Sequence, residues 1–386
     1  MTPRYLVERM RGFGETIFAE MSALAVETGA INLGQGFPDT DGPIQVSDAA
    51  IEAIRSGHNQ YPPGIGIPEL RHAVADHQHR FYGIDLDPDT EVLVTAGATE
   101  AIAAAILSLC EPGDEVVTFE PYYDSYAATV ALAGATLRTV TLRPPEFDYD
   151  PAELEDAIGP DTRLILLNSP HNPTGKVFAP DELAHVARLA VEHDVLVVTD
   201  EVYEHMVFDG VHTPLETLPG MDERTLTISS AGKTLSFTGW KIGWVTGPAE
   251  LVATVRTVKQ YLTYVSGGPF QHAAAVGLRL GDDYFEGLTA DLRARRDLLC
   301  DGLADVGFEV YRPAGTYFVV ADILPFGTSD GRRFCLELPE RCGVVAVPCE
   351  VFYQHPDRGR NLVRFTFTKR TEVLESAIDR LGALAG

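Results

Sequence analysis

The chain has 386 residues, of which 45% are hydrophobic and 22% charged, and its formal net charge is −26. This composition is typical of a globular protein, and the length fits two domains or one large domain with an appended smaller one. Because so negative a chain without any run of Lys or Arg would repel a phosphate backbone, nucleic acid is not expected as a partner.

The N-terminal segment, MTPRYLVERMRGFGETIFAE, lacks the uninterrupted apolar stretch of a secretory signal. No later stretch approaches the roughly 18 uncharged apolar residues that a membrane-spanning helix needs. The five cysteines show neither a CxxC pair nor a histidine spacing typical of zinc sites, so we expect no disulfide framework and no bound metal. We therefore expect a cytoplasmic protein that does not associate with membranes.

Short β-branched segments alternate with helical ones from residue 91 onward. A strand over 91–95, a helix over 96–110 and a strand over 116–120 form one β-α-β unit. Because the strands are apolar almost without interruption, they predict an α/β fold with a mostly parallel sheet covered on both faces. Further strands are predicted over 163–168, 195–201, 225–230 and 242–247, with a helix over 181–194.

The pattern changes after residue 285. Residues 288–307 predict a long amphipathic helix, and 316–323 and 361–369 predict strands of a smaller α+β domain. The first 40 residues lack the alternation of strand and helix and are expected to join that domain. We thus predict a large domain over 45–285 and a small domain formed by 1–44 and 286–386.

Polar side chains follow three of the predicted strands. The turn NSPHNPTG, over 168–175, exposes Asn172 after the first, Asp200 and Tyr203 follow the second, and Ser230 and Lys233 follow the third. In open α/β sheets, ligands bind beyond the carboxyl ends of the strands. We therefore expect these five side chains to meet in one crevice.

Lysine is rare in this chain, and two lysines stand eight residues apart in SSAGKTLSFTGWKIGW, over 229–244. Unlike arginine, lysine can lose its proton near neutral pH when it is desolvated and can then attack a carbonyl. This chemistry makes Lys233 a candidate nucleophile for a carbonyl cofactor. The lysines of the chain are Lys176, Lys233, Lys241, Lys259 and Lys369.

Several motifs together resemble those of the class I pyridoxal-phosphate-dependent aminotransferases of fold type I. Within that class the chain is most similar to the branch that holds the kynurenine, glutamine and methionine aminotransferases and the actinobacterial N-succinyldiaminopimelate aminotransferases. The resemblance spans nearly the whole chain. It rests on INLGQGFPD (31–39), NQYPPGIGIPELR (59–71), TAGATEAI (95–102), EPYYDSY (120–126), NSPHNPTG (168–175), TDEVYEH (199–205), SSAGKTLSFTGWKIGW (229–244) and RFTFTK (364–369).

The resemblance implies roles around the cofactor ring. Lys233 corresponds to the lysine that condenses with pyridoxal phosphate and later carries a proton. Asp200 would face the pyridine nitrogen and keep it protonated. Tyr203 and Asn172 would hydrogen-bond the phenolic oxygen, and Tyr123 would stack on the ring.

The resemblance also implies a phosphate site and a substrate site. Lys241, Ser230 and the backbone amides of Ala98 and Thr99, at the start of a helix, would bind the cofactor phosphate. Many relatives have arginine where this chain has Lys241, which implies a point charge in place of a bidentate contact.

Three further positions follow from the same resemblance. Tyr61 would cross a subunit interface to the phosphate of the partner, so a homodimer with shared active sites is expected. Arg364 would bind the substrate α-carboxylate, and the backbone at Gly36 would help to close over the substrate.

Each of these residues also has an ordinary structural interpretation. Asp200 could cap a helix, Tyr123 could pack in the core, and Arg364 could be solvated or ion-paired. Tyr61 could anchor a loop, and Gly36 could serve a turn. A lysine between buried strands, by contrast, is rarely structural.

The expected activity is the transfer of an amino group from an L-amino acid to a 2-oxo acid by a ping-pong mechanism. The expected acceptor is 2-oxoglutarate. One alternative is a β-lyase or γ-synthase, because the same cofactor chemistry can eliminate a leaving group. Another is a non-enzymatic ligand sensor, although the intact lysine argues against it.

The amino donor is predicted from the segment YVSGGPF, over 264–270. Here Ser266 and Gly267 stand where the kynurenine and glutamine enzymes have an aromatic residue and a histidine, which predicts a wider pocket. Gly267 and Gly268 could offer backbone amides to a distal carboxylate. We therefore expect N-succinyl-LL-diaminopimelate or a similarly long dicarboxylic donor, with kynurenine, glutamine or methionine, or a merely permissive pocket, as alternatives.

Overall fold

The computed structural model describes residues 5–385. Residues 1–4 and 386, which the sequence assigns to the smaller domain, lie outside the described residues. Within residues 5–385, no helix is both long enough and apolar enough to cross a bilayer.

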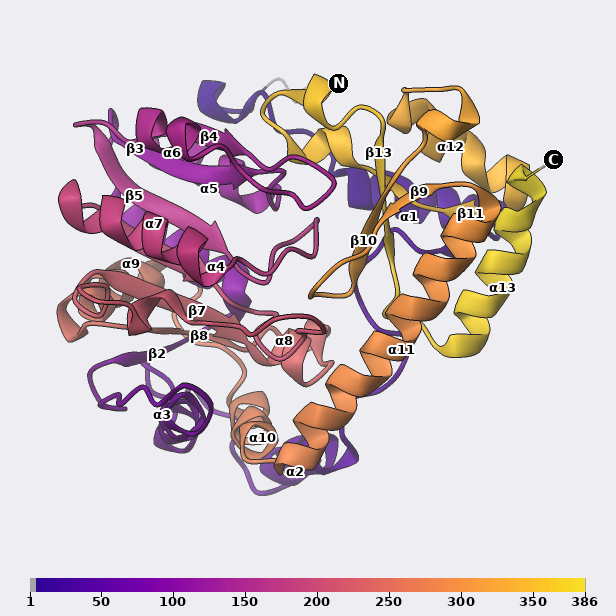
Figure 1. Cartoon of the computed structure of the whole chain (residues 1–386). Helices are drawn as coiled ribbons and strands as arrows, with labels where there is room; N and C mark the ends of the chain where they lie inside the picture. The colour runs from indigo at the N-terminus through magenta and orange to yellow at the C-terminus, as the bar shows by residue number, and fades with distance from the viewer. Residues whose placement is uncertain (1–4, 386) are drawn as a thin grey trace.

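A seven-stranded sheet forms the centre of the larger part of the molecule (Figure 1). The strands from β3 to β7 run parallel to their neighbours, whereas β8 is antiparallel to both β7 and β2. The prediction of an α/β fold with a mostly parallel sheet is therefore confirmed. In spatial order the strands are β2 (Val92–Thr95), β8 (Gly243–Thr246), β7 (Thr225–Ser230), β6 (Leu196–Asp200), β5 (Thr162–Asn168), β3 (Glu115–Glu120) and β4 (Thr136–Thr141).

The edge strand β4 was not predicted from the sequence. Its first four residues, TLRT, are exposed or half-buried, whereas β2 at the opposite edge of the sheet is buried throughout. The inner strands are buried along nearly their whole length and read as continuous apolar segments. This difference in burial explains why the inner strands were recognised and the edge strand was not.

Helices cover both faces of this sheet (Figure 1). Local sequence defines several helix ends: α3 begins with Pro68 and ends before Gly83, whose φ is 69°, and α7 begins with Pro180. The helices of this part are α2 (Ile44–Arg55), α3 (Pro68–Tyr82), α4 (Gly97–Leu109), α5 (Ser125–Ala133), α6 (Pro151–Ala157), α7 (Pro180–Glu192), α8 (Ala231–Thr234), α9 (Ala249–Leu262) and α10 (Gly268–Leu278).

A second part is built around a four-stranded antiparallel sheet in the order β12, β13, β10, β9. A two-stranded parallel pair, β1 with β11, joins the N-terminal segment to it. Its elements are α1 (Ile17–Thr28), β1 (Ile31–Asn32), α11 (Asp282–Val306), β9 (Glu309–Tyr311), β10 (Phe318–Asp322), α12 (Gly331–Cys342), β11 (Val344–Val345), β12 (Val347–Pro348), β13 (Leu362–Thr366) and α13 (Thr371–Leu381).

The long helix α11 runs from the region of α2 and α10 to the second part (Figure 1). It begins six residues before the predicted helix, so the predicted boundary at residues 285 and 286 falls within its first turns. The division into domains over 45–285 and over 1–44 with 286–386 stays a prediction.

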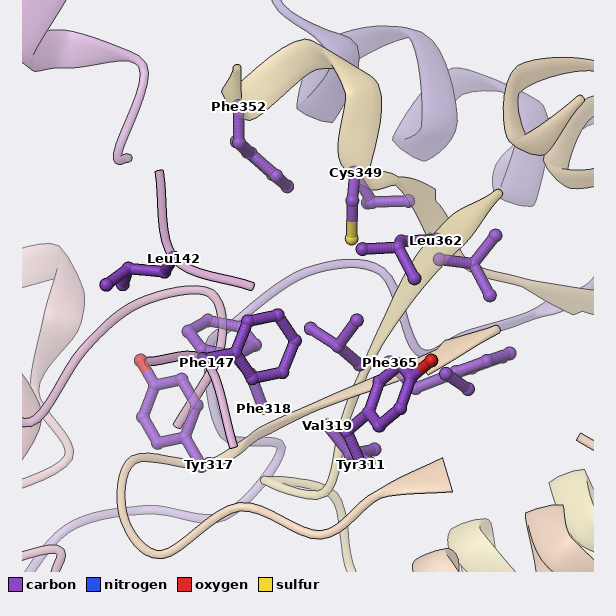
Figure 2. Close-up of a cluster of buried hydrophobic side chains, with 14 of the residues drawn as sticks. Leu142, Phe147, Tyr311, Tyr317, Phe318, Val319, Cys349, Phe352, Leu362 and Phe365 are labelled. Atoms are coloured by element: carbon purple, nitrogen blue, oxygen red, sulfur yellow. The ribbon is translucent and has the colours of Figure 1, made fainter. Parts of the chain in front are cut away.

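One hydrophobic core joins the two parts. Figure 2 shows Leu142 and Phe147, from the segment after β4, in the same buried cluster as Phe318 of β10 and Phe352. All four belong to a single cluster of buried side chains and are at most 3% exposed. Because the carboxyl ends of the parallel strands face this junction, a cavity forms between the large sheet and the second part.

Candidate active site

A cavity lies at the carboxyl ends of β5, β6 and β7, and β10 and β13 close it from the second part. It is lined by every residue to which the sequence assigned a role at the cofactor or the substrate α-carboxylate, except Tyr61; the residues predicted to form the donor pocket lie outside it. The lining residues are Phe18, Gly36, Gly97, Ala98, Thr99, Ile102, Tyr123, Asn168, Asn172, Asp200, Val202, Tyr203, Ser230, Gly232, Lys233, Thr238, Lys241, Ile242, Phe318 and Arg364.

Lys233 lies in the short helix α8, directly after β7. Its Nζ donates a hydrogen bond of 2.7 Å to the hydroxyl of Tyr317, which in turn donates one of 2.6 Å to the carbonyl of Gly36. The rings of Tyr203 and Tyr317 lie 5.6 and 5.4 Å from the amine. Two tyrosine rings thus hold the amine in the cavity, and no carboxylate of the described residues forms an ion pair with it.

Asp200 is the last residue of β6 and is 5% exposed. Its Oδ2 accepts a hydrogen bond of 2.6 Å from the hydroxyl of Tyr126, whereas its buried Oδ1 has no partner among the described residues. Burial raises the pKa of Asp200 to about 6, although the Tyr126 hydrogen bond opposes the shift. The chain after β6 forms a turn, so the helix-cap interpretation of Asp200 does not apply.

Asn172 connects the turn after β5 to the second part. Its backbone N–H donates to Oδ1 of Asn168 at 2.7 Å, and its own Oδ1 accepts from Nη1 of Arg364 at 2.9 Å. Tyr203 is 3% exposed, and burial raises the pKa of its hydroxyl well above the ordinary value. Both side chains therefore have fixed positions at the cavity.

Arg364 lies in β13 and is 1% exposed. Besides Asn172, it donates from Nη2 to the carbonyl of Gly34 at 3.0 Å, while its Nε has no partner within residues 5–385. The guanidinium stacks over Phe318 at 3.9 Å, and burial lowers its pKa to about 10, so it stays cationic at neutral pH. No carboxylate among residues 5–385 forms an ion pair with Arg364, and its side chain is buried. The interpretation of Arg364 as a solvated or ion-paired arginine therefore does not apply. A buried unpaired cation is suited to an anionic ligand.

Lys241 faces the start of α4 at the opposite end of the cavity. Its Nζ lies 3.5 Å from the hydroxyl of Thr99, and burial, followed by the charge of Lys233, lowers its pKa. The backbone approaches closely here: Gly97 has φ 76°, and a Cβ on it would lie 3.2 Å from Nζ of Lys241. Together with Ser230, the first amides of α4 and this ammonium group can bind a phosphate.

Gly36 and Tyr123 also line the cavity. A Cβ on Gly36 would lie 2.4 Å from Phe318, so only glycine fits there. Tyr61, by contrast, is 81% exposed and contacts the ring of Tyr264 at 5.5 Å. Ser266, Gly267 and Gly268 do not line the cavity either, and a Cβ on Gly268 would lie 3.1 Å from the carbonyl of His58.

Sequence reasoning missed three residues that the structure brings to the site. Tyr126 and Tyr317 hydrogen-bond Asp200 and Lys233, and Phe318 stacks on Arg364. Tyr126 stands inside the EPYYDSY motif and Tyr317 inside the predicted strand TYFVVADI, but a tyrosine in a strand or helix ordinarily packs in the core.

The cavity fits pyridoxal phosphate on its own chemistry. The partnerless Oδ1 of Asp200 suits a protonated ring nitrogen, Lys233 suits the carbonyl, and Lys241 with the first turn of α4 suits the phosphate. These donor groups lie in one cavity, although they come from four separate segments of the chain.

Comparisons with known proteins agree with this chemistry. The sequence profile described as aminotransferase class I and II matches residues 28–381. A protein of Mycobacterium tuberculosis named probable N-succinyldiaminopimelate aminotransferase DapC is 53% identical over 98% of each chain, and the methionine aminotransferase of Escherichia coli is 40% identical over 96% of each. The solved structure of the M. tuberculosis N-succinyldiaminopimelate aminotransferase superposes with a TM-score of 0.96, at 54% identity, over 98% of this chain and 100% of that chain.

Proposed function

The chain belongs to the class I and II aminotransferases, which use pyridoxal phosphate, and from this premise we propose that its amino donor is N-succinyl-LL-diaminopimelate or a similarly long dicarboxylic amino acid. The acceptor in this proposal is 2-oxoglutarate. The similarity to the M. tuberculosis protein carries the proposal, because it extends over 98% of both chains at 53% identity. Methionine is the alternative donor, favoured by the 40% identity to the E. coli enzyme.

The side chains of the cavity support the following division of roles. Pyridoxal phosphate, when bound, supplies the carbonyl that takes up the amino group and acts as an electron sink. Lys233, whose amine is held by Tyr317, would bind the cofactor carbonyl and would move a proton at the substrate Cα. Asp200 keeps the ring nitrogen protonated through its partnerless Oδ1.

The remaining roles concern binding. Arg364 binds the α-carboxylate of the substrate beside Asn172, because it is a buried cation without an ion-pair partner among the described residues. Tyr203 and Asn172 hydrogen-bond the phenolic oxygen of the cofactor, and Tyr123 stacks on its ring. Ser230, Lys241 and the amides of Ala98 and Thr99 bind the phosphate, and Gly36 lines the substrate side.

We also propose a cytoplasmic homodimer in which each cavity is completed by the other chain. Tyr61 and the segment around Gly267 lie together outside the cavity of their own chain, so they can serve a site only from a partner. Their surroundings expose large apolar side chains, which suits an interface. These are Ile44, Ile51, Ile54, Tyr261, Leu262 and Tyr264.

The donor proposal is tested by kcat/KM for a panel of amino donors with 2-oxoglutarate. The panel contains N-succinyl-LL-diaminopimelate, methionine, kynurenine and glutamine. We expect the succinylated donor to be preferred, and Gly267→His to reduce that preference because the imidazole fills space next to the shared site. A preference for methionine or kynurenine that Gly267→His leaves unchanged would refute the proposal.

The dimer is tested by mixing two inactive variants, Tyr61→Ala and Lys233→Ala. Heterodimers contain one site with both native residues, so mixing is expected to restore part of the activity. Sedimentation of the wild type gives the assembly state independently. A fully active monomer would contradict shared sites.

A further inference from the structure

Three side chains that can bind a metal converge behind the turn that carries Asp200 and Tyr203. His77 comes from α3, whereas Glu204 and His205 follow β6. Nε2 of His77 lies 2.7 Å from Nε2 of His205, and one ligand atom from each of the three side chains lies within 4.8 Å of the others. Among residues 5–385, no other three His, Cys, Asp or Glu side chains are grouped in this way.

The chemistry of this group is that of a divalent transition metal site. At 2.7 Å, one of the two facing nitrogens must lack a proton, so at least one imidazole already presents a lone pair. Two imidazoles and one carboxylate form the ligand set of many zinc sites that keep a fourth position for water.

The surroundings hold these ligands in place. Oε1 of Glu204 accepts a hydrogen bond of 2.7 Å from Ser229, and the backbone carbonyl of His205 accepts one of 2.7 Å from Thr289 of α11. The rings of Phe81 and Phe285 pack against His205 at 4.6 and 4.4 Å. Hydrogen bonds and packing contacts of this kind, to the ligand residues and not to the metal, orient metal ligands and limit the access of solvent.

A surface cleft gives access to the group. It is bounded by Glu204 and His205 on one side and by Phe285, Thr289 and Arg293 of α11 on the other. His77 does not line this cleft and is 2% exposed, so an ion would reach it past Glu204 and His205, and a water molecule from the cleft would take the fourth coordination position.

We propose that His77, Glu204 and His205 bind a divalent transition metal ion such as Zn²⁺, with water as the fourth ligand. Tetrahedral coordination with bonds of about 2.0 to 2.2 Å separates neighbouring ligand atoms by roughly 3.3 to 3.6 Å. The two imidazoles must therefore move apart by a fraction of an ångström from their 2.7 Å contact. The ion would connect α3 to the turn that positions Asp200 and Tyr203, which lie outside the ligand set.

This site was not expected from the sequence, because the ligands show no motif spacing. His77 and His205 are 128 positions apart. A hydrogen-bonded histidine pair without any metal is the competing interpretation of the same contact, and the experiment must separate the two.

The test uses the full-length holoenzyme after treatment with a chelator, titrated with Co²⁺ or Zn²⁺ alone. We expect one tight equivalent per chain, visible absorption bands of tetrahedral Co²⁺, and a higher melting temperature with the metal. His205→Ala and His77→Ala are expected to weaken binding about 100-fold or more. His79→Ala is the matched control, because His79 lies on the same helix with an exposed side chain and should leave binding unchanged.

Glu204→Gln provides a second, milder variant, because it keeps the volume of the side chain and can still accept from Ser229. It is expected to weaken binding while circular dichroism stays that of the wild type. The proposal is wrong if the wild type takes up no tight equivalent, or if the three ligand variants, at His77, Glu204 and His205, bind the metal as the wild type and the His79→Ala control do. Either result would leave His77 and His205 as a hydrogen-bonded pair.

Discussion

Replacing Tyr126 by phenylalanine removes one hydrogen bond from Asp200, the carboxylate that we propose faces the cofactor ring. The hydroxyl of Tyr126 is fully buried and donates to Oδ2 of Asp200 at 2.6 Å. A hydrogen bond to a charged group contributes about 1.5 to 3 kcal/mol. That free energy corresponds to a rise of roughly 1 to 2 units in the pKa of Asp200. It also corresponds to a loss of roughly 10- to 150-fold in cofactor affinity.

The direction of the pH effect follows from the same contact. The Tyr126 hydrogen bond lowers the pKa of Asp200, which burial raises to about 6. Without this hydrogen bond the pKa of Asp200 is higher, so a larger fraction of the carboxyl group is neutral at a given pH. A neutral carboxyl group attracts the protonated ring nitrogen of the cofactor less strongly. The affinity loss in Tyr126→Phe should therefore be larger at about pH 6 than at about pH 8.

The assay is titration of the apoenzyme with pyridoxal phosphate across this pH range, followed by absorbance. Tyr311→Phe is the control, because Tyr311 also pairs with a buried aspartate, Asp322, at 3.4 Å but lies away from the cavity. If Tyr126→Phe binds the cofactor as tightly as Tyr311→Phe at every pH, the assignment of Asp200 to the ring nitrogen is wrong.

Three further predictions concern the same cavity. Lys233→Ala should fold normally but lose turnover, and borohydride should no longer fix the cofactor covalently to the protein. A covalent adduct in this variant would assign the bond to another residue. Asp200→Asn should bind the cofactor more weakly and, even when saturated with cofactor, lose several orders of magnitude in kcat, and near-normal kcat would contradict its role. The apoenzyme should lose stability as pH rises from about 4 to about 6, because the pKa of Asp200 is raised from its ordinary value to about 6 in the folded state. The loss is at most about 3 kcal/mol in urea unfolding, and apo Asp200→Asn should lack this slope; an equal slope in both proteins would remove Asp200 as its cause.

Six of the seven strands of the large sheet, and the polar residues at the ends of three of them, could be predicted from the sequence. The inner strands are buried on both faces, so their segments are apolar throughout and recognisable without neighbours. Asn172, Asp200 and Lys233 could be placed together for a simple geometric reason: parallel strands bring their carboxyl ends to one edge. The edge strand β4 escaped recognition because half of it faces solvent and its residues alternate.

Only the tertiary structure decided which side chains touch the candidate catalytic groups. Tyr126 reaches Asp200 across 74 positions, Tyr317 reaches Lys233 across 84, and His77 reaches His205 across 128. Local propensity and periodicity report which face of an element is buried, but they contain no information about the element that packs against it. The partners of Asp200, Lys233 and His205 follow from the packing of α5, β10 and α3, which depends on the whole chain.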